Sequence, residues 1–133
     1  MGRRLILDTG ILIAYERGTI DRAAIDDDDL AIAAITVAEY RTGIELADSA
    51  ARAAERARAI ATILDVVEVL DYTPATAVHH AALIASARRA GTPRGAHDLI
   101  IAAHARETGR SVVTRDDRAR FGGLPGVDVV RAG

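Results

Sequence analysis

The chain has 133 residues, half of them hydrophobic, and a formal net charge of −2. This length suits a single domain with its own core, and we assign residues 1–133 to one domain. The absence of cysteine excludes disulfide bonds and thiolate metal sites and fits a reducing cytoplasm. No apolar run approaches the ~18 residues that span a bilayer, and Asp8 ends the first run too early for a signal peptide.

The basic residues are all arginine, 17 in number, with no lysine. Lysine is the phosphate ligand of a P-loop, so that class of nucleotide-binding site is excluded. The slight negative charge argues against a nucleic-acid coat protein. RNA binding remains open, because arginines around a metal-binding acidic cluster can hold phosphates through their planar forks.

The first part of the chain predicts strand, helix, strand and helix in that order. Residues 4–7 form a buried strand, and apolar spacing predicts a helix over 9–16 that ends at Gly18. Residues 30–35 predict a second strand, and Thr36 begins a helix that continues to about Ala47. The four acids at 26–29 are expected to form a solvated loop, since four adjacent side chains cannot all face one ion.

The second part continues the alternation of helices and strands. A long helix is predicted over 50–67, a short strand over 67–70, and a helix over 74–90 between Pro74 and Gly91. After a loop at 91–96, a helix runs from His97 or Asp98 to Glu107. A strand at 111–114, a helical turn at 117–120 and a strand at 127–130 complete the chain. This order predicts an α/β domain whose mainly parallel sheet carries helices on both faces.

Four acidic residues lie where apolar runs give way to helical patterns: Asp8, Glu39, Asp98 and Asp116. In a parallel α/β sheet the carboxyl ends of the strands share one rim, and ligands bind in the crevice there. Acids that are distant in sequence are therefore expected to converge. Converging carboxylates repel one another unless some are protonated or a cation lies between them. A hard divalent cation, Mg²⁺ or Mn²⁺, is the usual solution.

Helix capping is the structural alternative for each acid taken alone. Asp8, Asp98 and Asp116 would accept hydrogen bonds from the free N–H groups of a first helical turn. Glu39 stands three residues after Thr36, which is the spacing of a capping box. Capping does not require acids at the ends of several strands, because serine or threonine serves as well.

Four short motifs follow one another along the chain. They are Leu-Asp8-Thr9 with Leu12, Thr36-Val-Ala-Glu39-Tyr40-Arg-Thr-Gly43-Ile44, Asp98-Leu-Ile-Ile-Ala-Ala103, and Val113-Thr114-Arg-Asp116 with Phe121 and Leu124-Pro125-Gly126. In this order and at these separations they resemble the PIN-domain family, and most closely the VapC-type toxins of bacterial toxin–antitoxin pairs. The resemblance covers nearly the whole chain and implies a PIN-like domain.

The resemblance implies that Asp8, Glu39, Asp98 and Asp116 are the catalytic quartet and hold Mg²⁺ or Mn²⁺. Glu39 either binds metal or orients the attacking water. Thr114 would be an accessory polar residue. Asp117 is a second candidate for the fourth acid, although the spacing from Thr114 favours Asp116. Gly10 departs from the family, since such toxins often carry serine or asparagine there.

The implied activity is hydrolysis of RNA phosphodiester bonds in the cytoplasm. The implied partners are a cognate VapB-type antitoxin, whose C-terminal part covers the active-site groove, and a second copy of the chain in a homodimer. The apolar faces of 50–67 and 74–90 are candidate surfaces for both, with core packing as an equal alternative. Arginines near the motifs are candidates to steer RNA, or ordinary solvated surface: Arg41, Arg94, Arg115, Arg118 and Arg120.

Two other functions stay open at this point. A non-catalytic PIN-like module would bind RNA or protein, and a metal-dependent phosphatase would use another α/β fold. The intact quartet argues against the first, and the lack of an Asp-x-Asp pair after the first strand argues against the second. A histidine general acid such as His97, which shares a helix face with His104, is disfavoured because no nucleophile is paired with it. Tyr15 and Tyr40 are expected in the core.

Overall fold

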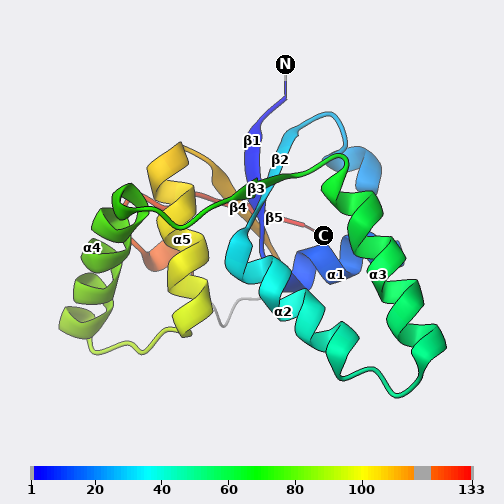
Figure 1. Ribbon diagram of the computed structural model, residues 1–133. Helices are drawn as coiled ribbons and strands as arrows, with labels where there is room; N and C mark the ends of the chain where they lie inside the picture. The colour runs from blue at the N-terminus through cyan, green and yellow to red at the C-terminus, as the bar shows by residue number, and fades with distance from the viewer. Residues whose placement is uncertain (1, 116–120, 133) are drawn as a thin grey trace.

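The computed structural model describes residues 2–115 and 121–132 (Figure 1). The strands are β1 (Arg4–Leu7), β2 (Asp29–Ala33), β3 (Glu68–Leu70), β4 (Ser111–Thr114) and β5 (Val129–Arg131). The helices are α1 (Thr9–Arg17), α2 (Ala34–Glu45), α3 (Ala50–Leu64), α4 (Pro74–Ala90) and α5 (Ala96–Thr108), with short 3₁₀ turns at Arg22–Ala24 and Phe121–Gly123. The predicted alternation of strands and helices is confirmed.

The five strands form one parallel sheet in the order β3-β2-β1-β4-β5. β1 lies in the centre, and its residues Leu5, Ile6 and Leu7 are fully buried because both faces of the sheet are covered. The chain first builds outward from β1 through β2 to β3. It then crosses to the other side of β1 and adds β4 and β5, which places a topological switch point between β1 and β4.

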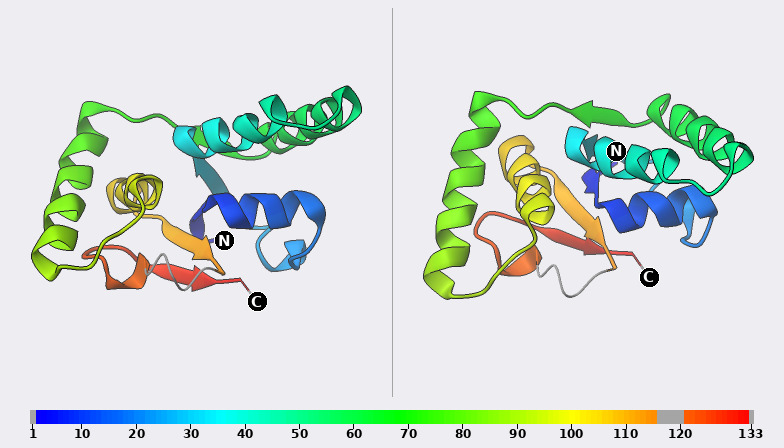
Figure 2. Two further views of the ribbon diagram at one scale, coloured as in Figure 1. Left: turned by 90° about the horizontal axis from the view of Figure 1, so that it is seen from below. Right: turned by 60° about the horizontal axis from the view of Figure 1, so that its bottom comes forward.

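Two hydrophobic clusters lie on opposite faces of the sheet. Leu5 and Leu7 pack in one cluster with Ile60 of α3 and with α1, whereas Ile6 and Val112 pack in the other with α4 and α5. Successive side chains of a strand point to opposite faces, which explains the division within β1. Figure 2 shows α1 and α3 on one side of the sheet and α4 and α5 on the other. The predicted coverage of both faces is confirmed.

Several predicted boundaries differ from the structure. α2 begins at Ala34 and not at Thr36, and β2 begins at Asp29, so the last residue of the 26–29 acidic run belongs to a strand. α3 ends at Leu64, which is 37% exposed, and not at Val67. Apolar residues lie on both sides of the start of α2 and of the end of α3, so hydrophobic periodicity did not locate these two boundaries. α4 has the predicted bounds.

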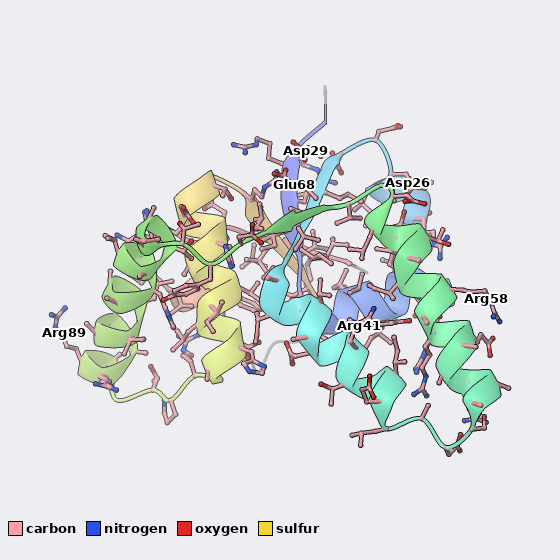
Figure 3. The ribbon with its side chains drawn as sticks, in the orientation of Figure 1. Asp26, Asp29, Arg41, Arg58, Glu68 and Arg89 are labelled. Carbon is pink, nitrogen blue, oxygen red and sulfur yellow. The ribbon has the colours of Figure 1, made fainter. Side chains whose placement is uncertain are left out.

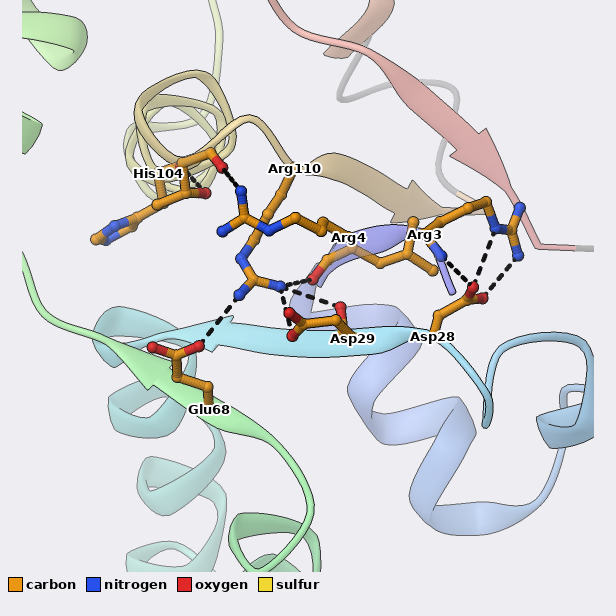
Figure 4. A network of polar contacts seen from close by, with 9 residues as sticks. Arg3, Arg4, Asp28, Asp29, Glu68, His104 and Arg110 are labelled. Atoms are coloured by element: carbon orange, nitrogen blue, oxygen red, sulfur yellow. Dashed lines mark hydrogen bonds and ion pairs between the residues drawn. The ribbon is translucent and has the colours of Figure 1, made fainter. Parts of the chain in front are cut away.

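A buried arginine joins four strands at the amino edge of the sheet, where Asp29 and Glu68 lie close together (Figure 3). Gly109 ends α5 in the left-handed conformation with φ of 67°, and Arg110 follows directly. One terminal nitrogen of Arg110 donates to the carbonyl oxygens of Leu5 and Asp29 at 3.1 and 3.0 Å. The other donates to Oε2 of Glu68 at 3.1 Å (Figure 4). Arg110 therefore links the start of β4 to β1, β2 and β3.

Within residues 2–115 and 121–132, no helix has the length and apolar character needed to cross a bilayer.

Candidate active site

The candidate residues lie near the carboxyl edge of the sheet. β1 and β2 lead into α1 and α2 there, and α5 begins at the same end of the molecule (Figures 1 and 2). α2 packs against both α1 and α5. The first turns of these helices therefore surround the rim that parallel α/β sheets use for ligands.

Asp8 is held by the backbone at the end of β1. Its Oδ1 accepts a hydrogen bond of 2.8 Å from the backbone N–H of Ile11, and the side chain caps α1. The capping alternative therefore holds for Asp8, and a carboxylate that caps a helix can accept further contacts. A Cβ atom at Gly10 would lie 3.7 Å from Oδ1 of Asp8, so the glycine leaves ordinary van der Waals room beside this carboxylate.

Glu39 extends from α2 between two other helices. Its Oε1 accepts a hydrogen bond of 2.9 Å from the hydroxyl of Thr9 on α1. Its Oε2 lies 3.2 Å from Nδ1 of His97 on α5. The capping box predicted for Thr36 and Glu39 is wrong, because α2 begins earlier, after Ala33, and has no side-chain cap. Thr36 is instead fully buried inside the helix.

Asp98 lies in the first turn of α5, and its predicted role as the N-cap is also wrong. The capping position is Gly95, which makes no side-chain hydrogen bond. A Cβ atom at Gly95 would come within 2.8 Å of Oδ2 of Asp98. Glycine therefore allows the Asp98 carboxylate to lie against the backbone at the positive end of the helix, where negative charge is stabilised.

Glu39 and Asp98 line one surface depression of about 320 Å³, together with Gly95, Ala96 and His97. Asp8 adjoins this group through Thr9, the next residue, whose hydroxyl reaches Glu39. The convergence of the predicted acids on one ion stays a prediction. Among the described residues, no three histidine or carboxylate side chains come close enough to enclose one ion.

The fourth predicted acid lies outside the described residues, as does its alternative: Asp116 and Asp117. Thr114 ends β4 beside β1 and is buried, with 6% of its surface exposed. Its carbonyl oxygen accepts a backbone hydrogen bond of 3.1 Å from Ala132. The accessory residue Thr114 therefore stands at the β1–β4 switch point, where a ligand site is expected.

The donor chemistry of the site fits a hard divalent cation. Carboxylate oxygens are the preferred ligands of Mg²⁺, which keeps several waters and takes one or two carboxylates in addition to substrate phosphates. Asp8, Glu39 and Asp98 supply oxygens only, and the chain has no cysteine that would favour a softer metal. Two carboxylates with water and phosphate would satisfy such an ion without a closed protein cage.

Sequence reasoning missed two contacts of the site. Thr9 appeared only as part of a motif, and His97 only as a disfavoured general acid. Both contact the Glu39 carboxylate, and each adjoins a predicted acid, Asp8 or Asp98. That adjacency was the available signal, since a polar neighbour of a site residue commonly reaches into the same site.

The candidate RNA-steering arginines differ in environment. Arg41 is exposed on α2 (Figure 3) and Arg115 is exposed after β4, with its guanidinium 3.5 Å from the carbonyl oxygen of Thr19. Arg94 is half-buried in the loop before α5. Arg118 and Arg120 lie outside the described residues. Exposed arginines near the rim are compatible with phosphate binding and with ordinary surface alike.

Comparison with known proteins decides the family. The PIN domain model matches residues 5–122, which is most of the chain and includes every candidate acid. The chain belongs to the PIN-domain family. The predicted resemblance is confirmed, and it extends to the VapC group.

Three relatives illustrate this position within the family. The chain is 31% identical to the tRNA(fMet)-specific endonuclease VapC of Shigella flexneri over 127 residues, which cover 91% of this chain and 94% of the relative. The structure of VapBC-5, from the VapBC family of toxin–antitoxin systems of Mycobacterium tuberculosis, aligns with a TM-score of 0.79 and 31% identity over 95% of this chain and 96% of the other. DNA-bound VapBC from Salmonella typhimurium aligns with a TM-score of 0.83 and 28% identity, over 97% and 98% of the two chains.

Proposed function

We propose that this PIN-domain protein is a Mg²⁺-dependent endoribonuclease and the toxin of a type II toxin–antitoxin pair. The observation that carries the proposal is the placement of Glu39 and Asp98 in one depression, with the hydroxyl of Thr9, the neighbour of Asp8, bonded to Glu39. Relatives of similar length that carry the VapC name support the choice of RNA as substrate.

The carboxylates of Asp8 and Asp98 would hold the ion, together with Asp116 or Asp117. When bound, Mg²⁺ lowers the pKa of a water molecule and stabilises negative charge that develops on the phosphate. Mn²⁺ would substitute because it accepts the same oxygen ligands. Asp8 is oriented for this by its backbone hydrogen bond, and Asp98 by its position in the first turn of α5.

Glu39 would orient the attacking water and accept its proton at a carboxylate oxygen. The longer glutamate side chain reaches from α2 into the depression, and Thr9 holds its Oε1. Each carboxylate oxygen has two acceptor positions, so one hydrogen bond at each oxygen still leaves room for water. The exposed arginines Arg41 and Arg115 would neutralise phosphates along the RNA backbone.

The proposed antitoxin would lie in a groove of about 510 Å³ between α1, α2 and α3. Glu39 lines both this groove and the depression that contains Asp98, so an occupant of the groove would reach the catalytic carboxylate. The groove carries both signs of charge, from Glu16, Arg17, Glu55 and Arg56. A VapB-type C-terminal segment with apolar and charged residues fits such a surface. We also propose a homodimer.

The test is cleavage of a mixed RNA pool by purified protein, with Mg²⁺ and with EDTA, beside the variant Asp8→Asn. Removing one ligand of an essential ion is expected to lower cleavage at least about 100-fold. The matched control is Asp65→Asn, an acid at the end of α3, which should keep full activity. Sequencing the RNA ends after brief expression in a bacterium identifies the substrate.

Other outcomes would favour the two alternatives. RNA binding without metal-dependent cleavage would indicate a non-catalytic module. Activity on phosphate monoesters alone would indicate a phosphatase. Cleavage that persists in both EDTA and Asp8→Asn would contradict the role of the carboxylates.

A further inference from the structure

The Glu39 carboxylate is contacted at both oxygens by side chains from different helices. Thr9 of α1 donates to Oε1 at 2.9 Å, and Nδ1 of His97 of α5 lies 3.2 Å from Oε2. A carboxylate can only accept, so the second contact is favourable when His97 carries a proton on Nδ1. That proton is present in one tautomer of the neutral ring and in the charged ring alike.

Glu39 needs such support more than the two aspartates do. Asp8 is fixed by the backbone N–H of Ile11, and Asp98 lies against the backbone at Gly95. Glutamate has one more rotatable bond, and its side chain here is 31% exposed. Holding such a side chain in one conformation costs up to about 2 kcal/mol of conformational entropy, and contacts at both oxygens offset this cost.

We propose that His97 is a positioning residue for Glu39. His97 holds Oε2 from α5 while Thr9 holds Oε1 from α1, and together they set the direction in which the carboxylate faces the depression that contains Asp98. This role rests on the proposed ribonuclease function and adds a residue to it. His97 would act through Glu39 and not as a general acid.

The surroundings of His97 favour this role over a structural one. Its side chain is 50% exposed, and it lies at the beginning of α5, outside both hydrophobic clusters. Substitution of so exposed a side chain changes stability little. Loss of function in a His97 variant would therefore report on Glu39 and not on folding.

Replacing His97 with asparagine or with glutamine tests whether a nitrogen at the position of Nδ1 is what Glu39 requires. The nitrogen of asparagine is bonded to Cγ, as Nδ1 of histidine is, whereas the nitrogen of glutamine lies one bond further out. We expect kcat to fall about 10–100-fold in His97→Ala with little change in KM, as for other residues that orient a ligand. His97→Asn should recover most of the loss and His97→Gln much less.

Two controls separate positioning from direct RNA contact. In a Glu39→Gln background, His97→Ala should cause almost no further loss, because the two residues act as one unit. His80→Asn is the matched control, since its Nδ1 also meets a single side-chain oxygen, that of Tyr72 at 2.8 Å. His80 is expected to be replaceable. Additive losses, or a rise in KM without a fall in kcat, would overturn the proposal.

Nitrogen-15 NMR of the four histidines tests the contact without any activity. We expect the His97 signal to report a proton on Nδ1 in the wild-type protein and to change in Glu39→Ala. Glu45→Ala, an exposed acid at the end of the same helix, should leave it unchanged. If wild-type protein cuts no RNA, the ribonuclease proposal fails while this signal still decides the contact. If the His97 signal is the same in the wild-type protein and in Glu39→Ala, the inference is overturned.

Discussion

At the scale of single residues, His104 is buried without the polar contacts that a histidine usually makes. It is 1% exposed, and within the described part of the chain neither ring nitrogen has a hydrogen-bond partner. The ring of Tyr72 packs edge-on against it at 6.3 Å between centroids. Burial lowers the pKa of His104 because the charged form loses its hydration, and nearby Glu107 and Asp71 only partly oppose this.

This burial predicts a loss of stability in acid. Below a pH of about 6.5 the unfolded chain binds a proton at His104 that the folded chain rejects, so the free energy of unfolding falls until the lowered folded pKa is reached. His104→Phe keeps a ring against Tyr72 and removes the titration. We expect its melting temperature to fall less than that of the wild type between about pH 7.5 and 5.5. Equal losses in the two proteins would contradict this explanation.

At the scale of elements, α4 is joined to α5 by a buried threonine. Thr76 forms a capping box with Thr73 at the start of α4, and its hydroxyl donates to Glu107 of α5 at 2.7 Å. The sequence indicated only that a helix begins near Pro74. The sequence did not indicate the partner on α5, because capping signals describe local chain geometry and not the packing of two helices.

Thr76→Val removes this hydroxyl while keeping the shape of the side chain. We expect a loss of about 1.5–3 kcal/mol in the free energy of unfolding, because Glu107 loses a donor and the backbone N–H of Thr73 loses its acceptor. Thr62→Val is the matched control, because that hydroxyl is exposed on α3 and bonds only to the carbonyl oxygen of Arg58. Urea denaturation measures both. Equal losses in the two variants would show that the Glu107 contact contributes nothing.

At the scale of the whole molecule, the two edges of the sheet have separate functions. The carboxyl edge presents the candidate acids, and the amino edge is joined by Arg110, whose side chain is 2% exposed. The carboxylates that meet it are more exposed, at 53% for Asp29 and 62% for Glu68. Its main contribution is therefore expected at the carbonyl oxygen of Leu5, where the hydrogen bond from the charged guanidinium is buried.

Arg110→Met keeps the length of the side chain and removes its donors. We expect a loss of about 1.5–3 kcal/mol, the usual range for hydrogen bonds from a charged group, because the bonds to Leu5, Asp29 and Glu68 are all removed. Arg89→Met at the exposed end of α4 (Figure 3) should change stability by less than about 0.5 kcal/mol. RNA cleavage per folded molecule should persist in both variants. An unchanged urea midpoint in Arg110→Met would rule out this role.

The sequence by itself determined the order of elements and the place of the acids along them. Hydrophobic periodicity and the glycines after helices located α1, α4 and α5 closely, since these signals lie within the element that they mark. Asp8 at the end of β1 and Thr114 at the end of β4 followed from the same patterns. These features depend on neighbouring residues only.

The tertiary structure alone decided what the acids contact. The spacing from Thr36 offered a capping box as the structural alternative for Glu39, yet its contacts are Thr9 and His97 on two other helices. Arg110 likewise finds its partners on β1, β2 and β3. Such pairs form when packing of elements brings distant positions together, and a single sequence carries no local signal for a contact whose two halves lie far apart along the chain.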